Sequence, residues 1–436
     1  MALAPGAPRA GGIGRALRHR NYRLFFRGQL VSLIGTWMQS TAQAWLVYRL
    51  TGSPVLLGLV GFSSQIPVFI AAPFGGALAD RVRRHRVLLV TQTASMALAF
   101  VLATLTLSGV IQVWHVFVLA PLFGLVNAFD IPARQSFISE IVQREDLLNG
   151  IALNSSMVNG ARIVGPALAG VLIAAVGEGW CFLANALSYI AVLSSLLSMR
   201  DLPARRPKPA ASPLQQIAEG FRFAYRTRPI RQLLGLLGFV SLMGMPYTVL
   251  MPIFADRVVE GGPRALGLLM GASGAGALTG ALLLAARRSM KGLSRWIALA
   301  CALFGVSLVA FSCSRNLWLS MALLYPAGLG MMIQMSASNT LVQTMSPDAM
   351  RGRVMALYSM MFMGMAPFGA LLSGTLAKHV GATWTVMMGG ICCMLAALAF
   401  GLRLAGFRQE ARRIIVAMPA LGGEPPEQST GARPAA

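Results

Sequence analysis

Apolar residues fall in long segments along most of the chain, separated by short polar and basic stretches. Each segment approaches the ~20 apolar residues that an α-helix needs to cross a bilayer. Strands of a membrane barrel would be about 10 residues long and would alternate apolar with polar side chains, which these segments do not. The pattern predicts twelve membrane-spanning helices, at about residues 24–48, 54–79, 87–108, 113–138, 148–175, 179–199, 230–254, 265–286, 293–312, 316–344, 354–377 and 381–405.

The composition strengthens this interpretation. Of the 436 residues, 56% are apolar and only 12% are charged, about half the charged share of a typical soluble domain. A water-soluble fold of this size could not bury so much apolar surface. The composition therefore predicts an all-α integral membrane protein and excludes intrinsic disorder for most of the chain.

The charge distribution predicts the orientation of the helices. The net charge is +23, from 37 Lys and Arg against 14 Asp and Glu. Most of these basic residues lie on the cytoplasmic side if the N-terminus is cytoplasmic, as the positive-inside rule requires. We expect both termini in the cytoplasm of a bacterium, a multi-pass location in the inner membrane, an uncleaved first span and no nucleic-acid partner.

A proline-rich linker divides the spans into two sets of six. Residues 200–213 contain four prolines and four basic residues, which is typical of a solvated linker. Apolar residues then recur at helical spacing, which predicts a short amphipathic helix at the cytoplasmic membrane surface. We expect an N-terminal six-helix bundle, a linker with this helix, a C-terminal six-helix bundle and a disordered cytoplasmic tail, at residues 1–199, 200–228, 229–405 and 406–436.

The two sets of spans repeat one another. Residues 124–177 align with 328–381 without a gap, and the alignment pairs several glycines, including Gly165 with Gly369 and Gly177 with Gly381. Parallel six-helix repeats are a feature of transporters in which two bundles rock about a site between them.

A basic loop lies between the second and third spans, where residues 75–86 read GGALADRVRRHR. Its carboxylate could accept hydrogen bonds from a helix N-terminus and pair with arginines, although a loop that only follows the positive-inside rule would also be basic. The loop resembles the signature motif of the major facilitator superfamily, with Arg83 where that family usually has a second glycine. The resemblance implies a gating role for a set of five residues, Gly76, Asp80, Arg81, Arg84 and Arg86.

The resemblance extends over about residues 18–405. The segments RNYRLFFRGQLVSLIGTWM, WLVYRLTGSPVLLGLVG, ARQSFI, LNGIALNSS and ARIVGPALAG are similar to the superfamily branch of bacterial exporters that includes enterobactin exporters and drug-efflux proteins. The fifth span resembles the family's antiporter motif, with alanines at two positions where glycines are usual. The resemblance implies export rather than import and assigns to the motif Gly160, Gly165, Pro166 and Gly170.

Charges inside the spans are the strongest candidates for transport chemistry. Asp130 and Arg134 lie four residues apart, so they share a helix face, and Arg162 lies in the fifth span. A charge within the bilayer is costly unless it is paired or faces water. One interpretation makes Asp130 the protonation site, with Arg162 or Arg134 tuning it. The other makes it part of a structural ion pair.

Polar stripes mark the spans that line the central cavity in this family. A polar stripe on a membrane helix should face protein or water, although interhelical hydrogen bonds would explain it equally well. The candidates for the substrate cavity are Gln29, Ser32, Thr36, Ser40, Gln43, Asn127, Tyr247, Gln334, Ser338 and Asn339.

These observations predict a secondary active transporter that exports small amphipathic compounds, of drug or siderophore type, by proton-coupled alternating access. A lipid or lysophospholipid transporter, or an importer of the same fold, is the alternative. The chain has no HExxH, Gly-x-Ser-x-Gly or Walker motif, so we expect neither an enzyme nor an ATP-driven pump. The five cysteines lack metal-ligand spacing. We therefore expect no metal and no cofactor, and we expect a monomer.

Overall fold

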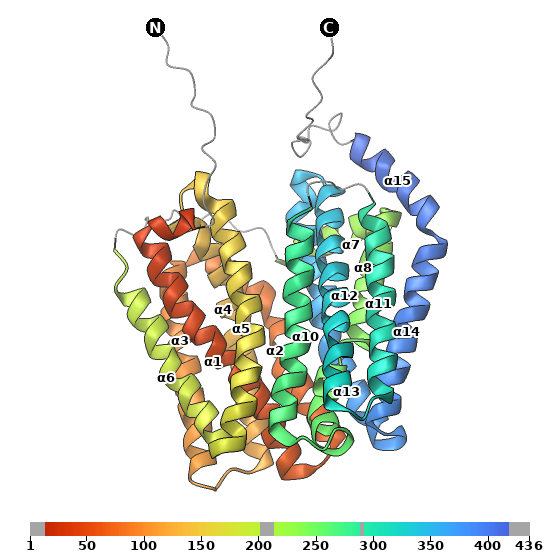
Figure 1. Ribbon diagram of the computed structural model, residues 1–436. Coiled ribbons are helices and arrows are strands. Elements are labelled where there is room, and N and C mark those ends of the chain that lie inside the picture. The colour runs from red at the N-terminus through yellow and green to blue at the C-terminus, as the bar shows by residue number, and fades with distance from the viewer. Residues whose placement is uncertain (1–13, 201–212, 288–291, 418–436) are drawn as a thin grey trace. The chain divides into compact units, whose positions relative to one another are not determined.

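The computed structural model describes residues 14–200, 213–287 and 292–417, and these residues are almost entirely helical. The first half of the chain forms six long helices (Figure 1), with the bounds α1 Arg20–Thr51, α2 Pro54–Arg81, α3 Arg84–Leu107, α4 Val113–Ile141, α5 Leu147–Val176 and α6 Glu178–Leu197. The second half forms α7 Pro213–Arg226, α8 Arg228–Met243, α9 Tyr247–Ile253, α10 Gly262–Ala285, α11 Leu293–Cys313, α12 Leu317–Thr344, α13 Asp348–Val380, α14 Ala382–Leu402 and α15 Leu404–Ala417.

The prediction of an all-α membrane fold is confirmed. Among the described residues, eleven helical segments are long and apolar enough to cross a membrane. The expected first span, α1, is not among them although it is 32 residues long. A stripe of Gln, Ser and Thr lowers the hydropathy of α1. We interpret α1 as a spanning helix whose polar side chains pack against other helices and do not face lipid.

The seventh expected span is one continuous path but two helices. The span Arg228–Val258 is interrupted after Met243 and resumes at Tyr247. Pro246 cannot donate a helical hydrogen bond. At Gly244, a Cβ would meet the side chains of Phe304 and Cys393, so only glycine fits at the break. The segment Phe254–Val258 then winds as a π-helix.

The internal repeat is visible in the helix boundaries. Helices α4 and α12 begin at Val113 and Leu317, which are separated by the same interval as Gly177 and Gly381. Those two glycines follow α5 and α13 with φ of +91° and +89°. A left-handed φ favours glycine at both positions, so the same turn joins α5 to α6 and α13 to α14.

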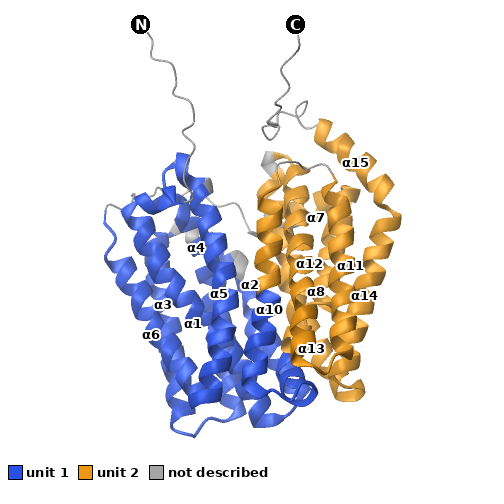
Figure 2. Ribbon diagram, viewed as in Figure 1, with its two compact units in different colours: residues 1–210, 251–274 blue, residues 211–250, 275–436 orange. Residues whose placement is uncertain are grey.

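The chain divides into two compact units (Figure 2). Unit 1 comprises residues 1–210 and 251–274, and unit 2 comprises residues 211–250 and 275–436. Unit 1 gives way to unit 2 after residue 210, within the linker expected at residues 200–228, and residues 251–274 group with the N-terminal helices. Helix α15 reaches Ala417, so the expectation of disorder from residue 406 is wrong for residues 406–417. The remainder of the expected tail lies outside the described residues.

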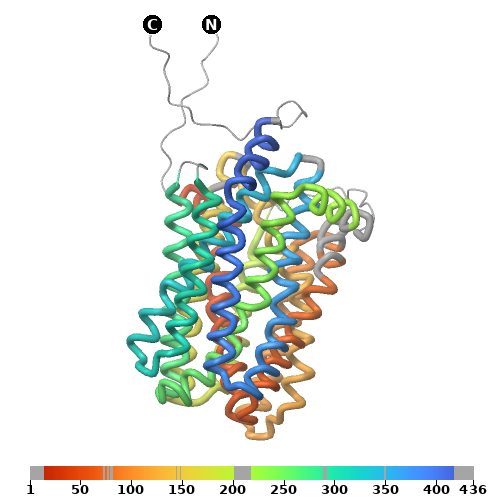
Figure 3. Tube along the Cα trace, turned by 90° about the vertical axis from the view of Figure 1, so that its right-hand side faces the viewer, coloured from red at the N-terminus to blue at the C-terminus, as the bar shows by residue number. Residues whose placement is uncertain are grey.

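Small residues let the helices of each unit pack closely, as is common in membrane proteins. In unit 1, α1 packs against α5 and α6, and α2 packs against α4. In unit 2, α11 packs against α12 and α14, and α8 and α7 pack against α13, an arrangement that Figures 1 and 3 show from two sides. Gly305 of α11 and Gly390 of α14 face one another, and a Cβ on either would lie within 2.8 Å of the other's carbonyl oxygen.

Candidate functional site

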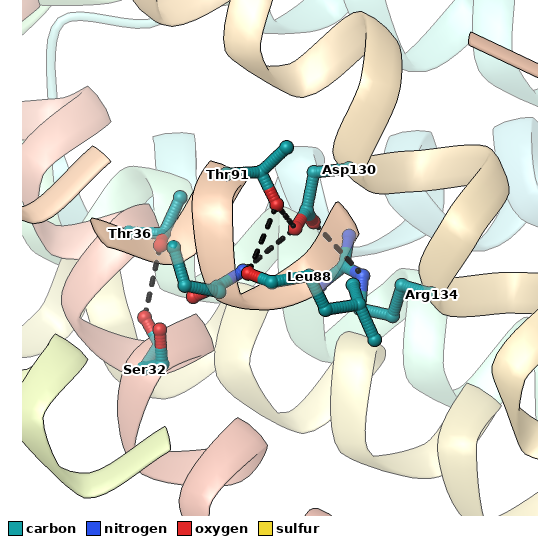
Figure 4. A network of polar contacts seen from close by, with 7 residues as sticks. Ser32, Thr36, Leu88, Thr91, Asp130 and Arg134 are labelled. Carbon is teal, nitrogen blue, oxygen red and sulfur yellow. Dashed lines mark hydrogen bonds and ion pairs between the residues drawn. The ribbon is translucent and has the colours of Figure 1, made fainter. Parts of the chain in front are cut away.

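Asp130 is held in a hydrogen-bonded network between α3 and α4 (Figure 4). Its Oδ1 accepts hydrogen bonds from Thr91 Oγ1 and Gln92 Nε2, both at 2.8 Å, and Arg134 Nε lies 3.5 Å from its Oδ2. Asp130 is only 4% exposed. Two hydrogen-bond donors and one guanidinium thus surround the carboxylate, as a polar group buried inside a span requires.

The sequence predicted the Asp130–Arg134 pair from its spacing but not the partners on α3. Thr91 and Gln92 precede Asp130 by almost forty residues, and only their polarity inside an apolar span marked them. The Gln92 Oε1 is buried and has no hydrogen-bond partner among the described residues. The network therefore retains one free acceptor next to the carboxylate.

Arg162 lies against Trp37 of α1. Its guanidinium carbon is 5.6 Å from the centre of the Trp37 ring, a distance typical of cation–π contact. The exposed large apolar side chains of α5 are Val164, Leu168 and Val171 in the second half of the helix, and Ile151 and Val176 nearer its ends. At 3.6 residues per turn, Arg162, Ser155 and Asn159 lie on the side of the helix opposite Val164, Leu168 and Val171.

The α1 stripe is mostly internal. Gln29 and Ser32 are buried, at 2% and 1% exposure, and Thr36 is half-buried with its hydroxyl donating to the Ser32 carbonyl at 2.9 Å. Gln43 is half-buried and Ser40 is exposed. The residues of the stripe thus differ in burial. Only Thr36, Ser40 and Gln43 are accessible to a ligand without a rearrangement of the helices.

The candidates on α9 and α12 are also buried. Tyr247 is 3% exposed, and its ring packs edge-on against Phe304. Gln334 and Ser338 are 1% and 0% exposed, and the Gln334 Nε2 and Ser338 Oγ have no hydrogen-bond partner among the described residues. Half-buried Asn339 accepts a hydrogen bond from its neighbour Gln343.

The repeat relates these residues to the network on α4. At the interval that separates α4 from α12, Gln334 occupies the position of Asp130 and Ser338 that of Arg134. The ion pair therefore has a neutral counterpart in the second half. Asn127 lies one turn before Asp130 on α4 and is half-buried.

The structure describes part of the signature loop. Gly76, Asp80 and Arg81 belong to the end of α2, but their side chains lie outside the described residues. Arg84 begins α3, is 8% exposed, donates to the Ser136 carbonyl at 2.7 Å and pairs with Glu140 at 3.0 Å. Arg84 thereby joins the start of α3 to the end of α4. Arg86, in contrast, is exposed.

The glycines of the antiporter-like motif differ in what they contact. A Cβ at Gly165 would lie 2.6 Å from the Trp37 Cβ of α1, and one at Gly170 would lie 2.9 Å from the Gly267 Cα of α10. Conversely, a Cβ at Gly267 would lie 2.6 Å from the carbonyl oxygen of Pro166 in α5. At Gly160, a Cβ would meet nothing within 4 Å. The motif thus produces two close helix contacts, and Gly160 takes no part in either.

A second polar cluster of unit 1 lies at the C-terminal end of α1. The Tyr48 hydroxyl donates to Asp256 Oδ2 at 2.6 Å and accepts from Arg257 Nε at 3.1 Å. One residue on, Arg49 pairs at 2.6 Å with Glu178, whose side chain is 6% exposed. The sequence pattern does not reveal this cluster, because Tyr48 and Asp256 are more than 200 residues apart and no periodicity links them.

Comparison with known proteins adds family information to this geometry. The profile of a family described as transmembrane secretion effector matches residues 15–419. A staphyloferrin A transporter of Staphylococcus aureus is 26% identical over 381 residues, which cover 87% of this chain and 95% of that protein. An enterobactin exporter EntS of Shigella boydii is 27% identical over 371 residues, covering 82% and 85% of the two chains.

Solved structures of other transporters share the fold. The peptide transporter POT in complex with sulfate superposes with a TM-score of 0.75 at 13% identity, over 92% of this chain and 97% of that one. The nucleoside transporter NupG gives a TM-score of 0.68 at 15% identity, over 89% and 99%. At such identities the likeness concerns the fold alone.

Proposed function

Because the chain belongs to the transmembrane secretion effector family of major facilitator transporters, we propose that it exports small amphipathic compounds, of drug or siderophore type, in exchange for protons. Membership of the family makes it a membrane transport protein. The direction, the substrate class and the coupling ion are the proposal. The observation that carries it is the buried carboxylate of Asp130 inside α4, joined to α3 and paired with Arg134.

Asp130 is the proposed proton carrier. A proton that binds the carboxylate removes its charge, and the ion pair with Arg134 then loses its attraction. The hydroxyl of Thr91 and the amide of Gln92 both donate to Oδ1, so neutralisation would also weaken the attachment of α3 to α4. Protonation of one atom can thus bias the packing of two helices, which is the coupling that an ion-driven transporter needs.

Substrate contact is proposed for Arg162, Trp37 and the less buried polar residues. Arg162 and Trp37 place a cation beside an aromatic face between α5 and α1. This combination suits compounds that carry an aromatic ring or an anionic group. Both curated relatives described above are named for siderophores, which supports the same substrate class.

Two contacts of unit 1 are proposed to change during transport. The Tyr48 cluster ties α1 to the residues after α9, and the Gly170–Gly267 contact ties α5 to α10. In both cases the partner lies within residues 251–274, which include the end of α9 and the first part of α10. Alternating access requires contacts of this kind to separate and re-form.

The membrane placement is also part of the proposal. The positive-inside rule supports a cytoplasmic position for both termini, and the bacterial relatives support the inner membrane. We also propose that the protein is a monomer.

Transport into inverted vesicles tests this function. Vesicles that contain the protein and matched vesicles without it would be energised to an acid interior, and uptake of enterobactin, staphyloferrin A and ethidium would be measured. The proposal expects uptake of at least one compound that stops when the proton gradient is collapsed. Uptake that persists without the gradient, or flow only in the opposite direction, would contradict it. Movement of lysophospholipid alone would favour the lipid transporter.

A further inference from the structure

We propose that the groove between α7 and α13 binds one anionic phospholipid from the leaflet that faces α7. The groove has a volume of about 550 Å³. Its apolar lining includes Phe221 and Tyr225 of α7 and Leu357, Met360 and Met361 of α13. This site is independent of the transported substrate, and the proposal does not rest on the export function.

The attachment of α7 to α13 fixes the shape of the groove. Glu219 pairs with Arg353 at 2.6 Å, and a Cβ at Gly220 would lie 3.0 Å from the Arg353 carbonyl oxygen. The two helices therefore meet closely on one side of α7. The rings of Phe221 and Tyr225, which line the groove beside this contact, stack at 6.3 Å and are 59% and 60% exposed.

The connection of α7 to the next helix places the groove at the membrane surface. Only Thr227 separates the end of α7 from the start of the span Arg228–Val258. Exposed aromatic rings are favourable at that depth, where headgroups meet acyl chains. Met361 lies eight residues beyond Arg353 within the span of α13, about 12 Å deeper at 1.5 Å per residue. The groove thus provides a path for an acyl chain.

Two arginines give the groove its preference for an anion. Arg222 and Arg226 line it, are exposed and have no ion-pair partner among the described residues. Like charges four residues apart on a helix repel, and an anion between them would offset the repulsion. Arg231 stacks on the Tyr225 ring at 5.0 Å and donates to its carbonyl oxygen, which holds the ring in place. A phosphate at the rim and an acyl chain below it match both features.

A second basic surface of the same unit provides the control. Helix α15 carries Arg408, Arg412 and Arg413 around a surface hollow, but its lining lacks an aromatic pair. General attraction of anionic lipid to positive charge would act on this surface as strongly as on α7. The two sites therefore separate a built lipid site from a charged surface.

The test is lipid retention by the full-length protein in detergent, measured by native mass spectrometry. Phosphatidylglycerol and phosphatidylcholine with identical chains would be titrated against the wild type, R222Q/R226Q, R222K/R226K and R412Q/R413Q. We expect the wild type to prefer phosphatidylglycerol and R222Q/R226Q to weaken its binding roughly 30-fold. The R222K/R226K variant, which keeps the charge, and R412Q/R413Q should both retain the preference.

Three results would overturn the proposal. The first is equal binding of the two lipids by the wild type, and the second is an equal loss in R412Q/R413Q, which would indicate attraction by charge alone. The third is displacement of the lipid by inorganic phosphate in large excess, which would indicate a simple anion site. If R222Q/R226Q folds poorly, the comparison of lipid binding rests on R222K/R226K, provided that this variant is monodisperse.

Discussion

Replacing Gly170 with alanine should disrupt the contact between α5 and α10, whereas the same change at Gly160 should be tolerated. Both glycines lie in α5, and both belong to the segment that resembles the antiporter motif. They differ in their surroundings, so the pair isolates the contact from the general effect of alanine in a helix.

The structure gives the expected magnitude. A Cβ at Gly170 would lie 2.8 Å from the Pro263 carbonyl oxygen and 2.9 Å from the Gly267 Cα. These are backbone atoms, so no rotamer change can relieve the contact, and the two helices must move apart. Overpacking of this kind typically costs about 1–3 kcal/mol. At Gly160 nothing lies within 4 Å, and alanine should stabilise the helix by about 0.5–1 kcal/mol.

The assay is the apparent melting temperature of each purified variant in detergent, followed by transport in vesicles. We expect Gly170→Ala to melt below the wild type and to transport poorly, and Gly160→Ala to match or exceed the wild type in stability. If Gly170→Ala were as stable and as active as Gly160→Ala, the close contact between α5 and α10 would be wrong.

Two further substitutions test the polar clusters of unit 1. Thr91→Val removes one donor to the buried carboxylate of α4 and should lower the free energy of unfolding by about 1–3 kcal/mol. Thr106→Val, whose hydroxyl bonds only within its own helix, should change stability far less. Tyr48→Phe should lower the melting temperature, because the side chain loses both charged partners. Tyr325→Phe, which loses one neutral hydrogen bond to Thr279, is the control for Tyr48→Phe. If a variant and its control lost the same stability, the polar cluster tested by that variant would not stabilise the protein as described.

Hydrophobic patterning predicted the fold because burial in a bilayer leaves few alternatives to helices. The pattern could not predict the interruption of the span Arg228–Val258, because Gly244 is required there by Phe304 and Cys393 from distant helices. The pattern also did not predict α15. Its apolar and basic residues follow a helical period, but they lie beyond the last span, where a disordered tail was expected.

The candidate site was predictable where its residues are neighbours on one helix. Asp130 and Arg134 share a face by spacing alone, and the structure places them 3.5 Å apart. Partners from other helices were not predictable, since nothing in a single sequence states which faces of α3 and α4 meet. The same limit applies to Tyr48, whose partners come from the other half of the sequence.

Proton release on substrate addition is the most direct test of proton-coupled export through Asp130. A transported compound, chosen from enterobactin, staphyloferrin A and ethidium, would be added to inverted vesicles with an acid interior. The wild type would be compared with Asp130→Asn. The substitution keeps the side-chain shape and removes the charge. We expect proton release with the wild type only. Exchange of labelled for unlabelled substrate, which needs no net proton movement, should persist in the variant. Equal proton release from both proteins would show that Asp130 is structural and that the coupling site lies elsewhere.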